Sequence, residues 1–443
     1  MVNPHKNSTI LVVISTPEYY RNFISSPALY KIKDRCVFIV HEKLMVKDFL
    51  GIKREQLVPY LYPERYKSWY RHFFYVDAWR YRHKSSSFAF RFEQLSSRRR
   101  KFYYKLASLP VIYNLVKFFV FKITRDKNLE GILSVINPQA ILLPSGGYDG
   151  LSFEIIRIAK KKKIPTCLLI DNWDNLTSKT VLTRRPDYLV VWGKQAVEDA
   201  VRIHNMERSH VFPLGTPRFM EYMNRDGRDL PSPYNFKYIL FAGIAAPFDE
   251  LSTLKKLEEI IDRKGIGIKI IYRPHPWRKH RKCADTFFEY DFKHIVIDEQ
   301  AKLYYKRDEM DEFNDVFMPD LKYYPKLLAN MEFMICPLST MMIEGLLFGK
   351  KVFVPVYDDG VHFTNPKNLL ARHTHFKDIN KFKNIYLIEN TDDLEKIFTE
   401  SFSQISEADG VKYANIFDFI SPDTPNYPLE LEKLVNQITN SHV

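Results

Sequence analysis

A histidine held between two prolines follows an apolar run in the second half of the chain. The run 268–272 is β-branched and predicts a parallel strand, which ends near the first proline because proline has no N–H for a ladder. The turn that follows contains Arg273, His275 and Pro276, and Arg278 comes shortly after it. Positive donors on a stiff backbone suit a phosphate clamp, since little entropy is lost when the clamp orders. The alternative is a surface turn whose histidine only caps a neighbouring helix.

A serine–threonine pair further along the chain offers related chemistry. The run 333–356 reads as a strand, a turn at Ser339 and Thr340, a short helix, a glycine stop and a second strand. Either hydroxyl group can cap the helix, and the free N–H groups of its first turn can bind an anion. Glu344 falls one turn into the helix, where it could accept hydrogen bonds from sugar hydroxyl groups. Gly243, which follows an earlier predicted strand, is small enough to let backbone N–H groups approach a phosphate.

This ordered pair of motifs resembles the carboxyl-terminal, nucleotide-binding domain of GT-B glycosyltransferases, over residues 238–356. More narrowly, it is similar to polysialyltransferases, capsule Kdo transferases and CDP-glycerol glycerophosphotransferases, which carry a His-Pro motif followed by a Ser-Ser or Ser-Thr motif. The resemblance implies an α/β GT-B fold of two Rossmann-like, doubly wound domains facing a central cleft. It also implies that His275 and Arg273 neutralise the phosphate of a CMP-, CDP- or UDP-linked donor. The hydroxyl groups of Ser339 and Thr340 would share that charge.

Three aspartates in the first half of the chain are candidates for the base that deprotonates an acceptor hydroxyl group. Asp149 follows two glycines, where a substrate can come close. Asp149 also partly matches a motif of the polysialyltransferases, an acidic–acidic–glycine sequence whose last acid serves as the base. The match is partial because Tyr148 stands here in place of the first acid. Asp171 and Asp174 follow the next predicted strand and are alternatives, and Arg218 is a candidate on the acceptor side. For each aspartate, turn formation or helix capping is the competing role.

The composition favours acidic partners. The chain of 443 residues has 66 Lys and Arg against 53 Asp and Glu, a net charge of +13, which suits phosphorylated substrates, an anionic membrane surface or nucleic acid. Its four cysteines have no metal-ligand spacing, so we expect no metal site. The polar start does not read as a secretory signal, and no apolar run reaches the ~20 residues that span a bilayer. We therefore expect a cytoplasmic protein, peripheral at most on the inner face of the plasma membrane.

The strand and turn pattern predicts two domains and a returning tail. Residues 1–225 would form a Rossmann-like acceptor domain, and residues 235–400 a Rossmann-like donor-binding domain, joined by a polar linker that contains proline and glycine. Residues 401–443 would form helices that brace back on the first domain. Residues 287–311 read as mostly irregular.

Residues 61–127 interrupt the strand pattern of the first domain. They contain 16 Lys and Arg, 4 Asp and Glu, and 19 aromatic residues. Such a mixture suits the headgroup layer of an anionic membrane, a polyanionic acceptor or single-stranded nucleic acid. It also suits an ordinary helical insertion whose aromatic side chains are core and whose charges are solvated.

Together these features predict a metal-independent glycosyltransferase of surface-polysaccharide biosynthesis, with no cofactor beyond its nucleotide-sugar co-substrate. The expected partners are the donor, a glycan or lipid-linked glycan acceptor, and an anionic membrane surface through residues 61–127; nucleic acid is not expected. Alternatives are a non-hydrolysing nucleotide-sugar 2-epimerase, a polyol-phosphate transferase, or a non-catalytic basic protein that binds membranes or nucleic acid.

Overall fold

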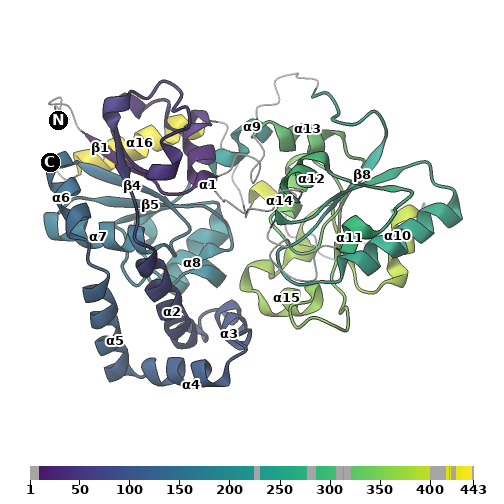
Figure 1. Cartoon of the computed structure of the whole chain (residues 1–443), viewed down its shortest axis with the longest axis horizontal. Helices are drawn as coiled ribbons and strands as arrows, with labels where there is room; N and C mark the ends of the chain where they lie inside the picture. The colour runs from purple at the N-terminus through teal and green to yellow at the C-terminus, as the bar shows by residue number, and fades with distance from the viewer. Residues whose placement is uncertain are drawn as a thin grey trace. The chain divides into compact units, whose positions relative to one another are not determined.

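The computed structural model describes residues 9–223, 230–276, 286–305, 313, 321–399, 416–418, 420 and 426–441. The chain divides into two compact units (Figure 1). Unit 1 contains residues 1–220, 373–375 and 419–443, and unit 2 contains residues 221–372 and 376–418. Arg278 and residues 225–229 of the expected linker lie outside the described residues.

Unit 1 is built on a seven-stranded parallel sheet with the strand order β3-β2-β1-β4-β5-β6-β7. Its strands are β1 Ile10–Ile14, β2 Cys36–His41, β3 Leu57–Tyr60, β4 Ala140–Ser145, β5 Thr166–Ile170, β6 Tyr188–Val191 and β7 Val211–Pro213. Every residue of β1, β4 and β5 is buried, as expected of parallel strands covered on both faces. The strand order reverses at β1, which is the switch point of a doubly wound sheet.

The helices of unit 1 bury the apolar side chains of these strands. Leu11 of β1 shares a core cluster with Leu133 of α6 and Ile155 of α7. The carboxyl-terminal helix α16 packs on β4 and on the turn η2 (Pro27–Leu29), and Arg35 donates to the Asn436 side chain at 2.8 Å. The helices are α1 Pro17–Tyr19, α6 Lys127–Ile136, α7 Gly150–Lys162, α8 Lys194–His204, α9 Met220–Met223 (which runs across the unit boundary) and α16 Tyr427–Asn440.

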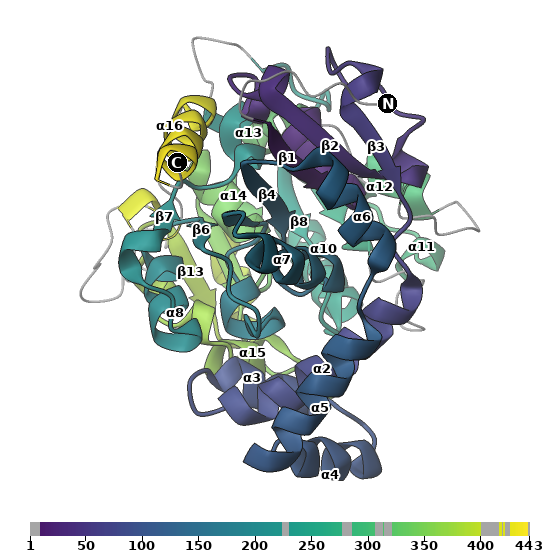
Figure 2. The ribbon, with the colours of Figure 1, turned by 90° about the vertical axis from the view of Figure 1, so that its left-hand side faces the viewer.

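The basic and aromatic segment forms a helical arm between β3 and α6. The arm consists of α2 Glu64–Tyr81, α3 Ser86–Glu93, α4 Arg98–Ala107 and α5 Pro110–Ile123. Helix α2 packs on both α4 and α5, and Figure 2 shows α4 at the end of the arm away from the sheet. Among the described helices, none alone is long and apolar enough to cross a membrane. Only α4 and α5 together meet that length and composition, and they are bent by 98°.

Unit 2 is built on a second parallel sheet, six-stranded, with the order β10-β9-β8-β11-β12-β13. Its strands are β8 Tyr238–Ala242, β9 Lys269–Arg273, β10 Ile295–Ile297, β11 Met334–Ile335, β12 Val352–Pro355 and β13 Ile385–Ile388. Its helices are α10 Glu250–Lys264, α11 Thr286–Glu289, α12 Glu299–Tyr305, α13 Tyr323–Asn330, α14 Met341–Leu347 and α15 Pro366–Arg372. The expectation of mostly irregular chain over 287–311 was wrong for its described part, because β10 and α12 form there.

Candidate functional site

Three of the predicted donor-binding segments lie at one edge of the unit 2 sheet. Strand β8 pairs in parallel with β9 on one side and with β11 on the other. Beyond the carboxyl ends of these strands come Gly243, His275 and Ser339, respectively. Since neighbouring strands are ~4.8 Å apart, the ends of β9 and β11 are about 10 Å apart, on either side of β8. The strand order reverses at β8, and doubly wound sheets bind their ligands at such a point.

Arg273 at the end of β9 belongs to a buried ion pair. Its side chain is 6% exposed and donates to Asp298, to Gln300 Oε1 at 2.6 Å and to the Tyr324 hydroxyl at 2.9 Å. Burial disfavours the charged guanidinium, but Tyr324, Asp298 and Tyr323 outweigh it and raise the pKa of Arg273. These contacts give Arg273 the role of fixing the end of β9. Its binding to a donor phosphate stays a prediction.

Asp298 was missed in the sequence. It follows β10 directly, its N–H donates to the Tyr272 carbonyl at 2.8 Å, and Oδ2 accepts from the N–H of Ala301 at 3.1 Å in the first turn of α12. Since β10 pairs with β9, Asp298 lies at the same carboxyl edge as Arg273. The available signal was an aspartate directly after the apolar run 295–297, which is typical of a strand end followed by a helix cap.

His275 lies half-buried beyond the end of β9, and so does Pro276. The backbone carbonyl of His275 accepts a hydrogen bond from the Tyr305 hydroxyl of α12 at 2.8 Å. The turn is therefore anchored on one side by the ion pair of Arg273 and on the other by Tyr305. The backbone that carries the His275 imidazole is therefore fixed by its contacts with other residues of unit 2.

Ser339 and Thr340 lead into α14. The Ser339 hydroxyl accepts from the N–H of Met341 at 3.2 Å, and its carbonyl accepts from the N–H of Met342 at 3.2 Å. Thr340 occupies the N-cap position with helical backbone angles and makes no side-chain cap. Two of the amides that were expected to be free for an anion are therefore already bonded. The turn also carries the hydroxyl groups of Thr340 and of Ser339, the latter 3.2 Å from Cys336 Sγ.

Glu344 and Gly243 both have structural partners in unit 2. Glu344 is buried and accepts from the Tyr222 hydroxyl at 2.7 Å. A Cβ at position 243 would come within 2.6 Å of Glu250 Oε2. Glu250 is itself buried and accepts from the N–H of Ile244 at 2.9 Å. The glycine is thus required by the buried carboxylate beside it, and the roles of Gly243 and Glu344 toward a donor stay predictions.

Asp149 caps α7 at the carboxyl edge of the unit 1 sheet. Its Oδ1 accepts from the N–H of Ser152 at 2.7 Å, and its Oδ2 accepts from the Ser145 hydroxyl. The loop between β4 and Asp149 is held by the Tyr19 hydroxyl, which accepts from the N–H of Gly146 at 2.8 Å. Asp149 therefore caps the helix, which was the competing role. Its carboxylate is also half-buried at a strand end.

The alternative base candidates lie beyond β5 in the same unit. Asp171 is half-buried, and Oδ1 accepts from Asn22 Nδ2 at 3.2 Å. Its Oδ2 receives no hydrogen bond from the residues that the structure describes. Asp174 forms an ion pair with Lys179 at 3.0 Å; burial opposes ionisation, but Lys179 and His375 outweigh it and lower the pKa of Asp174. The Arg218 guanidinium lies 5.4 Å from the ring centre of Trp192, a cation–π contact.

His375 reaches this edge from a distant part of the sequence and was not among the predicted residues. The segment 373–375 belongs to unit 1 although the residues on both sides of it belong to unit 2. His375 Nδ1 lies 3.0 Å from the Thr177 hydroxyl, and the ring packs against Trp173. Burial, opposed by Asp174, lowers the pKa of His375 to about 4. The histidine is therefore a neutral packing residue at pH 7.

The comparisons with known proteins bear on the fold. No family model matches the sequence, and no curated protein matches it. A crystal structure of a UDP-N-acetylglucosamine 2-epimerase matches with 12% identity and a TM-score of 0.52, covering 98% of this chain and 96% of that one. A putative UDP-N-acetylglucosamine 2-epimerase from Listeria monocytogenes matches with 12% identity and a TM-score of 0.52, covering 98% and 97%. The wall teichoic acid polymerase TagF is also similar, at 13% identity and a TM-score of 0.47, covering 99% and 90%.

These findings define the fold class. The chain has two units, each with a parallel, doubly wound sheet, and the epimerase structures match it over nearly their full length. The protein therefore has the two-domain α/β fold called GT-B, and the predicted fold class is confirmed.

Removal of the Asp298 charge tests the buried ion pair. Asp298→Asn leaves the Arg273 guanidinium buried without a counter-charge, which typically costs about 3–5 kcal/mol of unfolding free energy. The matched control is Asp291→Asn, the same change at an exposed position of unit 2, expected to stay within about 0.5 kcal/mol. Urea unfolding of both variants gives the comparison. A loss below about 1 kcal/mol for Asp298→Asn would contradict the positioning role of the pair.

The buried His375 predicts a pH dependence of stability. Its pKa of about 4 in the folded chain lies below the ordinary value of 6.5, so its contribution is complete above pH 6.5 and is lost as pH falls toward 4. The full effect is ~3 kcal/mol, at about 1.4 kcal/mol per pKa unit. His204, also lowered to about 4 by burial, adds to the effect in the same direction.

The His375→Asn variant isolates the contribution of His375. Unfolding free energies at about pH 7 and about pH 4.5 should differ less in this variant than in the natural chain. Equal differences would show that His375 does not titrate in this window.

Proposed function

We propose that the protein is a glycosyltransferase that moves a sugar from a CMP-, CDP- or UDP-linked donor to a hydroxyl group of a surface polysaccharide or lipid-linked acceptor. The observation that supports this most is the placement of His275, Ser339 and Gly243 beyond neighbouring strands at the switch point of unit 2. Negative charge grows on the leaving phosphate as the glycosidic bond breaks. Hydrogen-bond donors fixed at that position lower the barrier selectively.

The His275 imidazole and the hydroxyl groups of Ser339 and Thr340 would hold the leaving phosphate in this proposal. Because the backbone at His275 is already anchored, little conformational entropy would be lost when the donor binds. The Ser339 hydroxyl accepts from the N–H of Met341 and lies 3.2 Å from Cys336 Sγ, so its proton would turn from the weak sulfur acceptor to the phosphate when the donor binds. The proposal involves no metal ion.

The general base would come from unit 1. Asp149 remains the first candidate, because its carboxylate stands half-buried at a strand end beside glycines. Asp171 is the second candidate, since only one of its oxygens is engaged by the described residues. Either carboxylate would take the proton of the acceptor hydroxyl group as the oxygen attacks the anomeric carbon.

A non-hydrolysing epimerase is the second candidate function. It is favoured by the likeness to the two UDP-N-acetylglucosamine 2-epimerase structures, and it would use the same nucleotide-binding edge. The two functions differ in their substrates: a glycosyltransferase needs an acceptor, whereas an epimerase converts its sugar nucleotide without one. Appearance of the epimerised sugar nucleotide in the absence of any acceptor would replace the transferase proposal.

Nucleotide binding can be measured before any substrate is known. We expect one of CMP, CDP, UDP and GDP to raise the melting temperature selectively, since a ligand at 100 times its Kd adds about 2.7 kcal/mol to apparent stability. His275→Ala should abolish this rise. The matched control is His294→Ala, the same change just before β10 at the amino edge of the same sheet, and it should keep the rise. A rise that persists in His275→Ala would contradict the proposed phosphate site.

The role of Asp149 can be separated from its capping role. Asparagine caps helices about as well as aspartate, so Asp149→Asn should keep the cap and lose at most the bond from the Ser145 hydroxyl, about 1 kcal/mol, but it should lose about 10²-fold or more in turnover. Asp149→Ala should also lose about 0.5–2 kcal/mol of stability. Turnover is measured as nucleotide released from the corresponding sugar nucleotide in the presence of acceptor. Unchanged turnover in Asp149→Asn would transfer the assignment to Asp171, for which Asp171→Asn provides the same measurement.

A further inference from the structure

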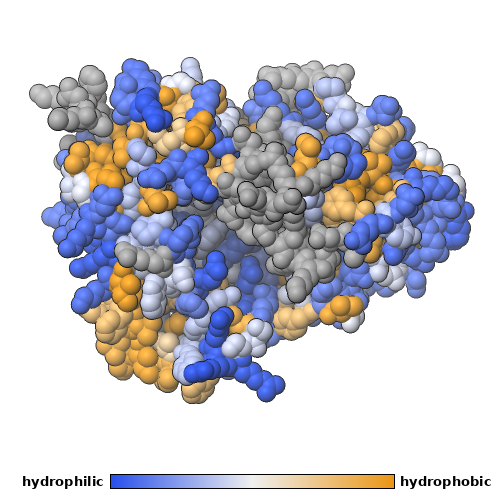
Figure 3. All heavy atoms as spheres, viewed as in Figure 1, coloured by the Kyte–Doolittle hydropathy of each residue, from blue (hydrophilic) through white to orange (hydrophobic). Residues whose placement is uncertain are grey.

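Helix α5 of the helical arm exposes a stripe of apolar side chains. Val111, Leu115, Phe118, Phe119 and Ile123 are 75%, 55%, 60%, 54% and 45% exposed. Their spacing of four, three, one and four residues places them on one face of the helix. In Figure 3 this stripe contributes to the apolar surface at the end of unit 1 that α4 and α5 occupy in Figure 1. The opposite face of α5 packs inward through Tyr113 and Val120.

The apolar surface continues beyond α5. Phe102, Leu106 and Leu109, in α4 and the turn before α5, are also exposed. Exposed arginines precede them at the start of α4 (Arg98, Arg99 and Arg100). The arm therefore combines an apolar stripe with basic residues beside it, which is the pattern of helices that lie in the plane of a membrane interface.

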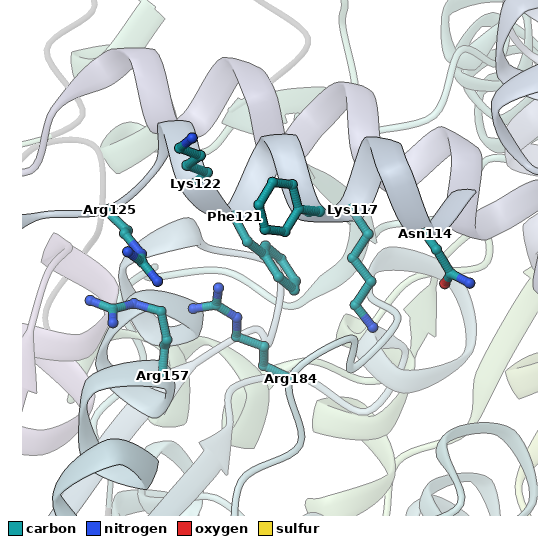
Figure 4. A pocket seen from close by; sticks show the side chains of 8 residues that line it. Asn114, Lys117, Phe121, Lys122, Arg125, Arg157 and Arg184 are labelled. Atoms are coloured by element: carbon teal, nitrogen blue, oxygen red, sulfur yellow. The ribbon is translucent and has the colours of Figure 1, made fainter. Parts of the chain in front are cut away.

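A basic pocket of about 350 Å³ lies against α5 in unit 1. Figure 4 shows the side chains of Arg125, Arg157 of α7 and Arg184 close together, with Lys117 and Phe121 of α5 reaching toward the same space. Five of its eight lining residues are cationic and none is acidic; the eight are Asn114, Lys117, Phe118, Phe121, Lys122, Arg125, Arg157 and Arg184. Phe118 belongs both to this pocket and to the apolar stripe, so the two features are continuous.

The positive charge of this pocket is only partly balanced by the described residues. Arg157 and Arg184 share the buried carboxylate of Glu154, at 2.7 and 3.3 Å, and Arg157 also pairs with Glu130 at 3.5 Å. Neither Lys122 nor Arg125 forms an ion pair with the residues that the structure describes. Burial lowers the pKa of Lys117, with Asp77 opposing and Arg184 reinforcing the shift. A bound anion would offset this mutual repulsion.

We propose that the helical arm docks on an anionic membrane surface, with a lipid headgroup phosphate in the basic pocket and the apolar stripe of α5 at the acyl boundary. Arginine guanidinium groups match phosphate oxygens in bidentate geometry. Exposed rings alone would also suit nucleic acid, whose bases stack on them. The exposed aliphatic side chains Val111, Leu115 and Ile123 cannot stack in that way, and they favour a lipid surface.

Vesicle co-sedimentation of the full chain, without nucleotide, tests this proposal independently of the proposed function. We expect binding to phosphatidylcholine vesicles that contain phosphatidylglycerol, and little binding to phosphatidylcholine alone. Diffuse attraction contributes about fivefold in affinity per basic residue at the surface, so the matched control Arg98→Gln/Arg99→Gln, outside the pocket, should weaken binding by up to about 25-fold. Lys122→Gln/Arg125→Gln removes the same charge from the same arm and also the contacts to the headgroup phosphate, so it should weaken binding more than the control. Phe118→Ser/Phe119→Ser should also weaken binding, whereas Val361→Ser/Phe363→Ser, exposed in unit 2, should not.

Several outcomes would overturn the proposal. Equal losses in the two charge variants would mean diffuse attraction without a headgroup site. Absence of binding to the acidic vesicles would exclude the docking itself. Tighter binding to single-stranded RNA than to the vesicles would assign the arm to nucleic acid. Displacement from vesicles by inorganic phosphate at concentrations that leave the ionic strength unchanged would assign the pocket to a soluble anion.

Discussion

The ion pair of Arg273 with Asp298 is the interaction on which the candidate donor site depends. It joins the ends of two neighbouring strands, β9 and β10, and both partners are buried. Taking two charges out of water is expensive, and the cost is offset only when the remaining donors and acceptors are also satisfied. Gln300, Tyr324 and Tyr323 satisfy them here. The resulting rigidity places His275, two residues further on, at a fixed point beside β8.

Parallel sheets explain why much of this arrangement could be predicted from the sequence. An apolar run that ends in Pro-His-Pro must leave its strand at the carboxyl edge, and the same holds for the run before Ser339. The sequence did not predict which hydrogen-bond or ion-pair partner each polar residue has. Arg273 was predicted to bind a donor phosphate, which stays a prediction; its observed partner, Asp298, directly follows a strand of only three residues. Strand pairing decides such contacts, and it brings together residues that are distant in sequence.

Asp149 and Ser339 show a related difficulty. Both were proposed for chemistry, and both bond to the backbone of a helix that starts beside them. The residue types that cap helices are also those that hold protons and phosphates, because both tasks need small side chains with exposed oxygen atoms. A sequence alone cannot distinguish capping from catalysis. Substitutions that preserve capping but change the chemistry can distinguish them, and the change from aspartate to asparagine is the most conservative of these.

The helical arm has both a core face and an exposed apolar face. Its inward residues form core, as with Tyr113, whose hydroxyl donates to the buried Asp77 at 2.9 Å, while Phe118 and Phe119 of the same helix face solvent. The arm is also fastened to the carboxyl edge of unit 1, because the Ser85 hydroxyl donates to the Thr177 carbonyl at 2.7 Å. Thr177, like Asp171, lies in the segment that follows β5. An arm fixed to a membrane through α5 would therefore also fix the orientation of that edge, and with it the side of unit 1 from which an acceptor can enter.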